Sequence, residues 1–173
     1  PAWAGVDIKT VTSPGGIKAW LVEDPSIPFM ALELRFRGGT SLDRQGARGA
    51  VNLMTGLLEE GAGEFDARAY ARELESLAAS VSFDNSDDDL SVSAQFLTEN
   101  RDQAARMLKL ALTQPRFDSD AIERVRQQIL SGLRSEATDP NDIAGKTFSA
   151  LAYGSHPYAT EGNGTIDSVA ALT

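Results

Sequence analysis

Residues 49–61 read Gly49-Ala50-Val51-Asn52-Leu53-Met54-Thr55-Gly56-Leu57-Leu58-Glu59-Glu60-Gly61, and the spacing of their side chains predicts an amphipathic helix. We expect this helix to start near Gly46 and to end before Gly61, because glycine is common just past a helix end. Asn52, Thr55 and Gly56 fall at i, i+3 and i+4, on a face that the helical period separates from the apolar stripe. That stripe comprises Ala47, Ala50, Val51, Met54, Leu57 and Leu58.

Three strands are predicted before this helix, at residues 8–11, 17–22 and 29–36, because apolar and polar residues alternate there. Residues 13–16, Ser-Pro-Gly-Gly, form the turn between the first two strands. The third strand alternates an apolar set with a charged set, which predicts a half-buried strand in an antiparallel sheet. The two sets are Leu32, Leu34 and Phe36, and Glu33, Arg35 and Arg37.

Helical and strand patterns alternate downstream of residue 61. Helices are predicted at residues 66–78, 119–137 and 142–153, and another runs from its N-cap Asn100, with Gln103 as capping partner, to Pro115. Strands at 80–83 and 90–96 flank a turn at 85–88. The order predicts an α+β fold, a two-layer sandwich in which helices cover one face of a largely antiparallel sheet. A last helical stretch begins at Ser168, and we expect the chain to be truncated there.

Composition excludes several classes of site. The 173 residues include no cysteine and one histidine, so thiolate zinc sites and cysteine nucleophiles are excluded. The 16 basic and 25 acidic side chains give a net charge of −9, which argues against nucleic acid as a partner. No apolar run of about 18 residues occurs, so we expect no membrane insertion.

Three short motifs favour structural roles over chemical ones. Residues 84–89 resemble a calcium loop in charge, but Asp89 and Gln95 stand where such a loop needs glycine and glutamate, which favours a solvated hairpin turn. Residues 38–41 lack the following lysine of a phosphate loop, which favours a turn. His156 alone cannot form a two-histidine zinc site and has no nearby nucleophile motif, so we expect a structural or surface role.

Five segments, in order, resemble the insulinase, pitrilysin and mitochondrial processing peptidase family of zinc peptidases. They are residues 13–20, 28–43, 49–61, 117–124 and 156–169, the last with His156-Pro157-Tyr158 and Gly164-Thr165-Ile166. Members of that family are built from homologous α+β half-modules that close as a clamshell. The resemblance therefore implies that residues 1–173 are a single N-terminal half-module, truncated at its C-terminus.

Active members of that family carry His-x-x-Glu-His on the helix matched by residues 49–61, where two histidines hold zinc and the glutamate activates a water. The resemblance places these three positions at Asn52, Thr55 and Gly56, and a distal glutamate ligand at Gly132. Asparagine and threonine are poor zinc ligands, and glycine offers no ligand atom. The resemblance thus implies a degenerate site, without a catalytic, cofactor-binding or metal-binding residue in this chain.

The resemblance further implies a catalytically inactive domain that pairs with a catalytic module and helps to enclose a peptide substrate. The partner would be a second half-module or a peptidase paralogue, and zinc is expected in that partner. The alternatives are a structural assembly subunit of a larger complex and an active metallopeptidase with an atypical site. We expect partner contacts on the face bearing Asn52, Thr55 and Glu59 or at a sheet edge. Family habit favours the bacterial periplasm, with the cytoplasm as the alternative.

Overall fold

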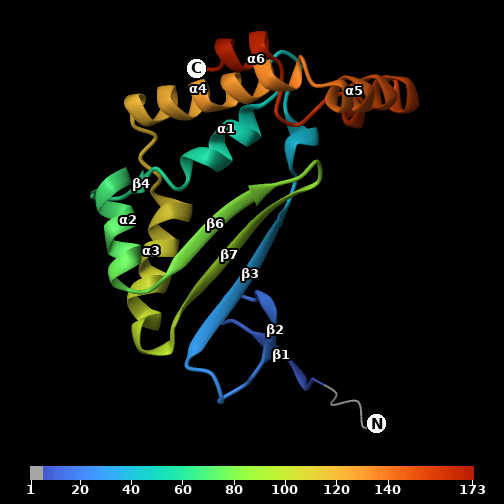
Figure 1. Cartoon of the computed structure of the whole chain (residues 1–173). Helices are drawn as coiled ribbons and strands as arrows, with labels where there is room; N and C mark the ends of the chain where they lie inside the picture. The colour runs from blue at the N-terminus through green and yellow to red at the C-terminus, as the bar shows by residue number, and fades with distance from the viewer. Residues whose placement is uncertain (1–5) are drawn as a thin grey trace.

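The computed structural model describes residues 6–173 as two layers, with helices stacked against one face of an antiparallel sheet (Figure 1). The strands are β1 (Ile8–Thr12), β2 (Lys18–Val22), β3 (Phe29–Arg37), β4 (Gly61–Ala62), β5 (Phe65–Asp66), β6 (Ser80–Asn85) and β7 (Asp89–Leu97). The α-helices are α1 (Ala50–Leu57), α2 (Ala67–Ser76), α3 (Arg101–Thr113), α4 (Ser119–Glu136), α5 (Pro140–Tyr153) and α6 (Ile166–Ala171). Three 3-10 turns are η1 (Thr40–Leu42), η2 (Thr98–Asn100) and η3 (Pro157–Ala159). The predicted α+β class is confirmed.

The main sheet has the strand order β3-β7-β6, and both pairs are antiparallel. In β7, Val92, Ala94 and Phe96 are buried and alternate with more exposed residues, because successive side chains of a strand point to opposite faces. The buried side chains pack toward α2 and α3, which cover this face of the sheet (Figure 1).

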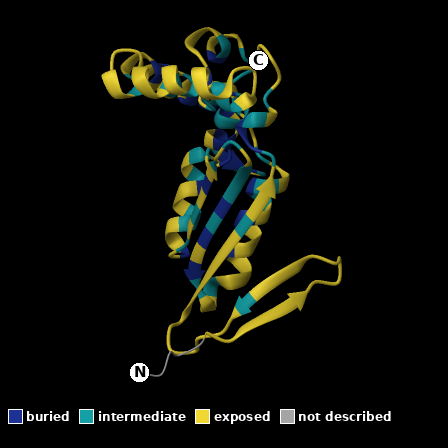
Figure 2. Ribbon diagram, turned by 90° about the vertical axis from the view of Figure 1, so that its right-hand side faces the viewer, coloured by how far each residue is buried: buried dark blue, intermediate teal, exposed yellow. Residues whose placement is uncertain are grey.

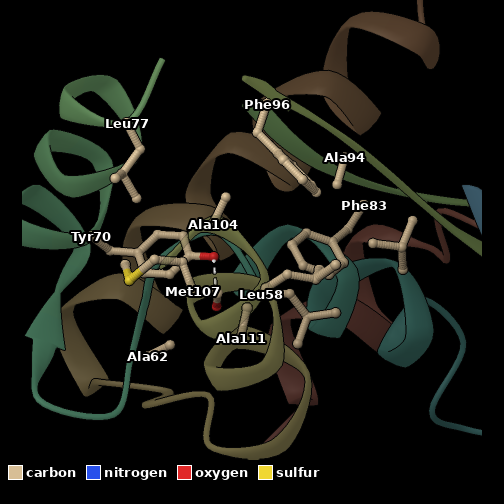
Figure 3. Close-up of a cluster of buried hydrophobic side chains, with 12 residues drawn as sticks. Leu58, Ala62, Tyr70, Leu77, Phe83, Ala94, Phe96, Ala104, Met107 and Ala111 are labelled. Carbon is tan, nitrogen blue, oxygen red and sulfur yellow. Dashed lines mark hydrogen bonds between the residues drawn. The ribbon is translucent and has the colours of Figure 1, made fainter. Parts of the chain in front are cut away.

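The main core lies between the sheet and helices α2 and α3 (Figure 3). Tyr70 of α2 is only 2% exposed, and its hydroxyl donates a hydrogen bond of 3.3 Å to the carbonyl oxygen of Met107 on α3. A buried phenol without a partner would cost about 1–3 kcal/mol, so this bond fixes how the two helices meet. The remaining members are Leu58, Ala62, Leu77, Phe83, Val92, Ala94, Phe96, Ala104, Leu108 and Ala111.

A second apolar cluster joins α1 to α4, which lies across it (Figure 1). The two helices run antiparallel. Gly56, late in α1, faces Val125 in the first half of α4, whereas Gly49, just before α1, lies against Val169 of α6. Val169 in turn packs on the second half of α4, at Leu130 and Leu133. The members of the α1–α4 cluster are Leu53, Leu57, Ala121 and Val125.

Asp43 caps the start of α1 from outside the helix. Its carboxylate accepts hydrogen bonds from the backbone N–H groups of Gly49 (2.8 Å) and Val51 (3.0 Å). Gly49, the residue before α1, has no side chain to do this, and helix N-termini leave such donors without a partner in the helix. The cap therefore comes from the loop that precedes the helix.

Arg48 joins the start of α1 to segments more than a hundred residues away. Its guanidinium donates to the carbonyl oxygen of Thr40 and to those of Pro157 (3.2 Å) and Thr160 (2.8 Å). Its own carbonyl oxygen accepts from the hydroxyl of Ser168 at 2.8 Å. The side chain of Arg48 thus holds η1 and η3 together, and its backbone carbonyl ties α6 to the same place.

The predicted start of helix 46–61 and the predicted cap of helix 101–113 are wrong. α1 begins at Ala50, because Gly49 has a φ of +91°, which interrupts the helix. Asn100 precedes α3, but its side chain donates to the carbonyl oxygen of Leu77 at 2.8 Å instead of capping the helix with Gln103. Two short strands, β4 and β5, escaped prediction because two residues carry no periodicity.

The last two helices also begin earlier than predicted. α5 starts at Pro140, because Asp139 accepts from the backbone N–H of Asn141 (2.7 Å) and caps it. α6 starts at Ile166 because Thr165 and Ser168 form a capping box.

The N-terminal strands are less buried than predicted. β1 and β2 form their own two-stranded sheet, separate from that of β3, and nearly all of it is exposed (Figure 2). Trp20 of β2 is 85% exposed, and in β3 Leu32 and Phe36 are 38% and 46% exposed. The prediction of a half-buried β3 is wrong because α2 and α3 contact β6 and β7, leaving most of β3 beyond their reach.

We predict that Arg48→Met lowers the free energy of unfolding by about 3 kcal/mol, because several charge-assisted hydrogen bonds to carbonyl oxygens are lost. Urea unfolding followed by circular dichroism measures this change. The control is Arg44→Met, at an exposed arginine of the same loop, which should change stability by less than about 0.5 kcal/mol. Equal effects of the two substitutions would contradict the role assigned to Arg48.

Burial raises the pKa of Tyr70 to about 12, and the nearby Glu59 carboxylate adds to the rise. The unfolded chain therefore releases this proton near pH 10 while the folded chain retains it, so stability falls as pH rises from 10 to 12, by up to about 3 kcal/mol. Tyr70→Phe should cost about 1 kcal/mol at pH 7 by losing a hydrogen bond, but should make the alkaline fall shallower. Urea unfolding at pH 7 to 12 tests this, with Tyr153→Phe, at an exposed tyrosine, as control.

Candidate functional site

The four positions of the predicted degenerate site lie on two facing helices. Asn52, Thr55 and Gly56 belong to α1, and Gly132 belongs to α4. Gly132 follows Val125, which contacts Gly56, by about two helical turns on the same side of α4. Because the helices are antiparallel, Gly132 lies toward the N-terminal half of α1, where Asn52 is.

Thr55 is directed into the protein and not toward solvent. It is only 3% exposed, and its hydroxyl donates to the carbonyl oxygen of Val51, one turn earlier, at 2.8 Å. Met54, from the predicted apolar stripe, is instead exposed. The predicted assignment of the two faces is wrong here because α1 is packed on more than one side, against α4 and against β6.

Asn52 is half-buried, and its side-chain oxygen accepts a hydrogen bond of 3.2 Å from the side-chain amide of Asn85, at the end of β6. This bond ties α1 to the sheet. The side-chain amide of Asn52, at the predicted position of the first zinc ligand, is therefore engaged in a structural hydrogen bond.

The two glycines differ in the space around them. A Cβ atom at Gly56 would lie 3.0 Å from a methyl carbon of Val125, so any side chain there requires Val125 to shift. A Cβ atom at Gly132 would meet nothing within 4 Å. The position of the distal ligand is therefore open, while the position of the second histidine is partly filled.

Acidic side chains surround the end of α1. Burial raises the pKa of Glu59, and the backbone N–H of Phe83, which donates to it at 3.3 Å, opposes that rise, while Asp84 and Glu60 add to it. Glu60 forms an ion pair with Arg124 of α4. These contacts hold the end of α1 against β6 and α4. They do not bring several possible metal ligands together at one point.

Ligand-bearing side chains are dispersed. Within residues 6–173, no three His, Cys, Asp or Glu side chains are grouped so that they could hold a metal ion. His156 is exposed, accepts from the backbone N–H of Tyr158 (3.2 Å) and packs edge-on against the Tyr158 ring. His156 therefore lies at the surface, as predicted. In the same stretch of chain, every helix is too short or too polar to cross a bilayer.

The acidic turn between β6 and β7 is docked against the protein. Asp87 accepts from the hydroxyl of the buried Thr40 at 3.0 Å, and Asp88 accepts from the hydroxyl of Tyr158. A Cβ atom at Gly39 would lie 2.0 Å from the carbonyl oxygen of Ser86, so glycine is required there for the turn to approach. The prediction of a solvated turn is confirmed at Ser86 and Asp88, which are exposed, whereas Asp87 is half-buried. In the sequence, the glycine pair at residues 38–39 is the only signal that the β6–β7 turn approaches this segment.

Residues 18–165 match the family described as insulinase (peptidase family M16). The chain is 33% identical over 147 residues to a Helicobacter pylori protein named non-peptidase homolog YmxG, covering 85% of this chain and 34% of that protein. It is 22% identical over 162 residues to an uncharacterised zinc protease of Mycobacterium leprae, covering 94% of this chain and 36% of that protein.

Two solved structures share the fold over 97% of this chain and 41% of theirs. One is a peptidase M16 inactive domain from Pseudomonas fluorescens, with a TM-score of 0.91 and 28% identity. The other, at a TM-score of 0.84 and 16% identity, is a protease from Helicobacter pylori and supports the fold alone. This chain thus spans 34–41% of the length of these four proteins. It belongs to the insulinase family (peptidase family M16).

Proposed function

We propose that this chain is a non-catalytic module that pairs with a catalytic M16 module and helps to enclose a peptide, with zinc and the chemistry supplied by the partner. Family membership and the similarity to a domain described as inactive support the first part. Pairing with a further module is supported by the length of the relatives, because each of them contains more protein than the part that this chain matches.

The observation that carries this proposal is the state of the α1–α4 pair. A catalytic zinc site needs three protein ligands and an open position for water. Here the apposition of the two helices is retained through apolar packing, while the polar groups of Asn52 and Thr55 bond to Asn85 and Val51. The scaffold of the site thus persists with structural contacts in place of ligands.

The surface that we propose for pairing differs from the one expected from the sequence. Thr55 is buried and Asn52 is half-buried, so of Asn52, Thr55 and Glu59 only Glu59 is exposed for docking. α5 is a better candidate for the pairing surface, because none of its residues is buried. Phe148 and Leu151 lie on one side of this helix and are largely exposed.

Restoring the ligands tests the assignment of the degenerate site. We predict that Asn52→His, Gly56→His and Gly132→Glu, combined with Val125→Ala to make room, create a site that binds one zinc ion with a dissociation constant below about 1 μM. The unaltered chain should bind no zinc at that concentration. Titration against a chromophoric zinc chelator measures both.

The matched control moves the new glutamate by one residue, to Ser131, which is exposed on α4 but rotated by about 100° from Gly132. This variant should bind zinc at least tenfold more weakly. Equal binding by both variants would show that α1 and residue 132 do not converge. Stoichiometric zinc in the unaltered chain, with chelator-sensitive peptide cleavage, would overturn the inactive assignment itself.

Pairing is tested with an M16 peptidase module that carries an intact His-x-x-Glu-His motif and is encoded beside this chain. We predict that adding the chain raises chelator-sensitive peptide cleavage by that module. Leu151→Asp should weaken the pairing by about tenfold, because it places a charge in an apolar contact. Ala150→Asp, on another side of α5, is the control for the added charge. No binding between the unaltered proteins, measured by light scattering, would contradict the proposal.

A further inference from the structure

Lys146 of α5 forms ion pairs with two carboxylates that lie on different parts of the chain. Its ammonium nitrogen is 3.1 Å from Glu136, the last residue of α4, and 2.9 Å from Glu161, in the segment that follows η3. The three side chains are between 27% and 35% exposed, so both pairs are partly shielded from solvent. Lys146 therefore holds α5 to the helix before it and to the segment after it.

An aromatic contact joins α5 to the same segment. The ring of Tyr153, the last residue of α5, meets the ring of Tyr158 in η3 edge to face, with the ring centroids 5.7 Å apart. Such an arrangement is the favoured one for two aromatic rings. Residues 157–161 are thus attached to α5 by one ionic and one aromatic contact.

The backbone just beyond Glu161 lies directly against the start of α1. A Cβ atom at Gly164 would lie 2.5 Å from the carbonyl oxygen of Arg48, and a Cβ atom at Gly49 would lie 2.7 Å from the carbonyl oxygen of Asn163. The two backbones meet with no side chain between them. Because packing this close leaves no space to absorb a movement, a shift of residues 161–164 displaces residues 48 and 49.

Glu161 belongs to both sets of contacts. Its side chain pairs with Lys146, and its carbonyl oxygen accepts a hydrogen bond of 3.1 Å from the backbone N–H of Gly164. The same carbonyl oxygen lies 3.5 Å from the guanidinium of Arg48. One residue thus contacts α5 through its side chain and the segment against α1 through its backbone.

We propose that Glu161 couples α5 to α1, so that a displacement of α5 loosens the first turn of α1. The connection runs from Lys146 through Glu161 and residues 162–164 to Arg48 and Gly49. The coupling is a property of this chain alone, and its use in pairing rests on the proposed function. A partner that docks on α5 would act through it on the helix that carries the degenerate positions.

Hydrogen exchange of single amides, followed by NMR on the purified chain, tests the coupling. The amides of Val51 and Leu53 are hydrogen-bonded at the start of α1. Glu161→Gln keeps the backbone and the size of the side chain but removes the ion pair with Lys146. Both amides should then exchange about threefold faster, the effect expected for one partly exposed ion pair.

The first turn of α2 supplies a matched reference within the same spectra. The amide of Ala69 donates to the carboxylate of Asp66 at 2.8 Å, as the amide of Val51 donates to that of Asp43. Because helix ends open locally and independently, its exchange in Glu161→Gln should change by less than about 1.5-fold.

Two further variants identify the route. Glu136→Gln removes the other ion pair of Lys146, the one that leads to α4, and should change exchange at the start of α1 by less than about 1.5-fold. Lys146→Met should act like Glu161→Gln, and the two substitutions together should exceed either one by less than about 1.5-fold, since both remove the same pair. Lys109→Met, at an exposed lysine of α3, is the control for the lost charge and should leave α1 unchanged.

Three results would overturn the coupling. They are unchanged exchange at Val51 and Leu53 in Glu161→Gln, equal acceleration at Ala69, which would show a general loss of stability, and equal effects of Glu136→Gln and Glu161→Gln, which would place the route through α4. No partner protein is present in these measurements. A failure of the coupling is therefore distinct from a failure of the chain to pair with a catalytic module.

Discussion

The guanidinium of Arg48 is the contact on which the arrangement of this domain depends. It donates to carbonyl oxygens of η1 and of the segment at Pro157 and Thr160, so it joins the strand that enters α1 to the chain that leaves α5. Carbonyl oxygens in such turns have few other partners, and a charged donor satisfies several at once. Asp43 complements it by capping α1 from the same loop. Together they fix the start of the helix on which the family's active members place their metal site.

With α1 fixed at its start, apolar packing is sufficient to hold it against α4. Leu53 and Leu57 of α1 pack against Ala121 and Val125 of α4. These apolar contacts keep the two helices that bear the proposed degenerate site together. Buried polar side chains need hydrogen-bond partners. The side chains of Asn52 and Thr55 have such partners, in the side chain of Asn85 and the carbonyl oxygen of Val51.

The helices cover the sheet unevenly and leave one part of this domain exposed. α2 and α3 cover β6 and β7, and the β1–β2 hairpin and most of β3 lie outside that cover (Figure 2). A two-stranded hairpin has too few contacts to bury its own apolar side chains, as Trp20 shows. An exposed apolar set of this kind is typical of surfaces that meet another protein.

The sequence by itself determined the order of the longer helices and strands, the α+β class and the exclusion of a two-histidine or thiolate zinc site, because periodicity and the count of ligands are local or additive properties. One histidine and no cysteine suffice for the last of these. Only the tertiary structure decided which faces are buried. Helical spacing grouped Thr55 with a polar surface, yet α4 and β6 pack on two sides of α1 and bury it. Alternation in β3 suggested half-burial, yet α2 and α3 contact mainly β6 and β7, and every residue of β3 except Leu34 is exposed. A periodic sequence pattern shows that a helix or strand has an apolar face. Whether that face is buried depends on residues distant in the sequence that pack against it in the folded protein.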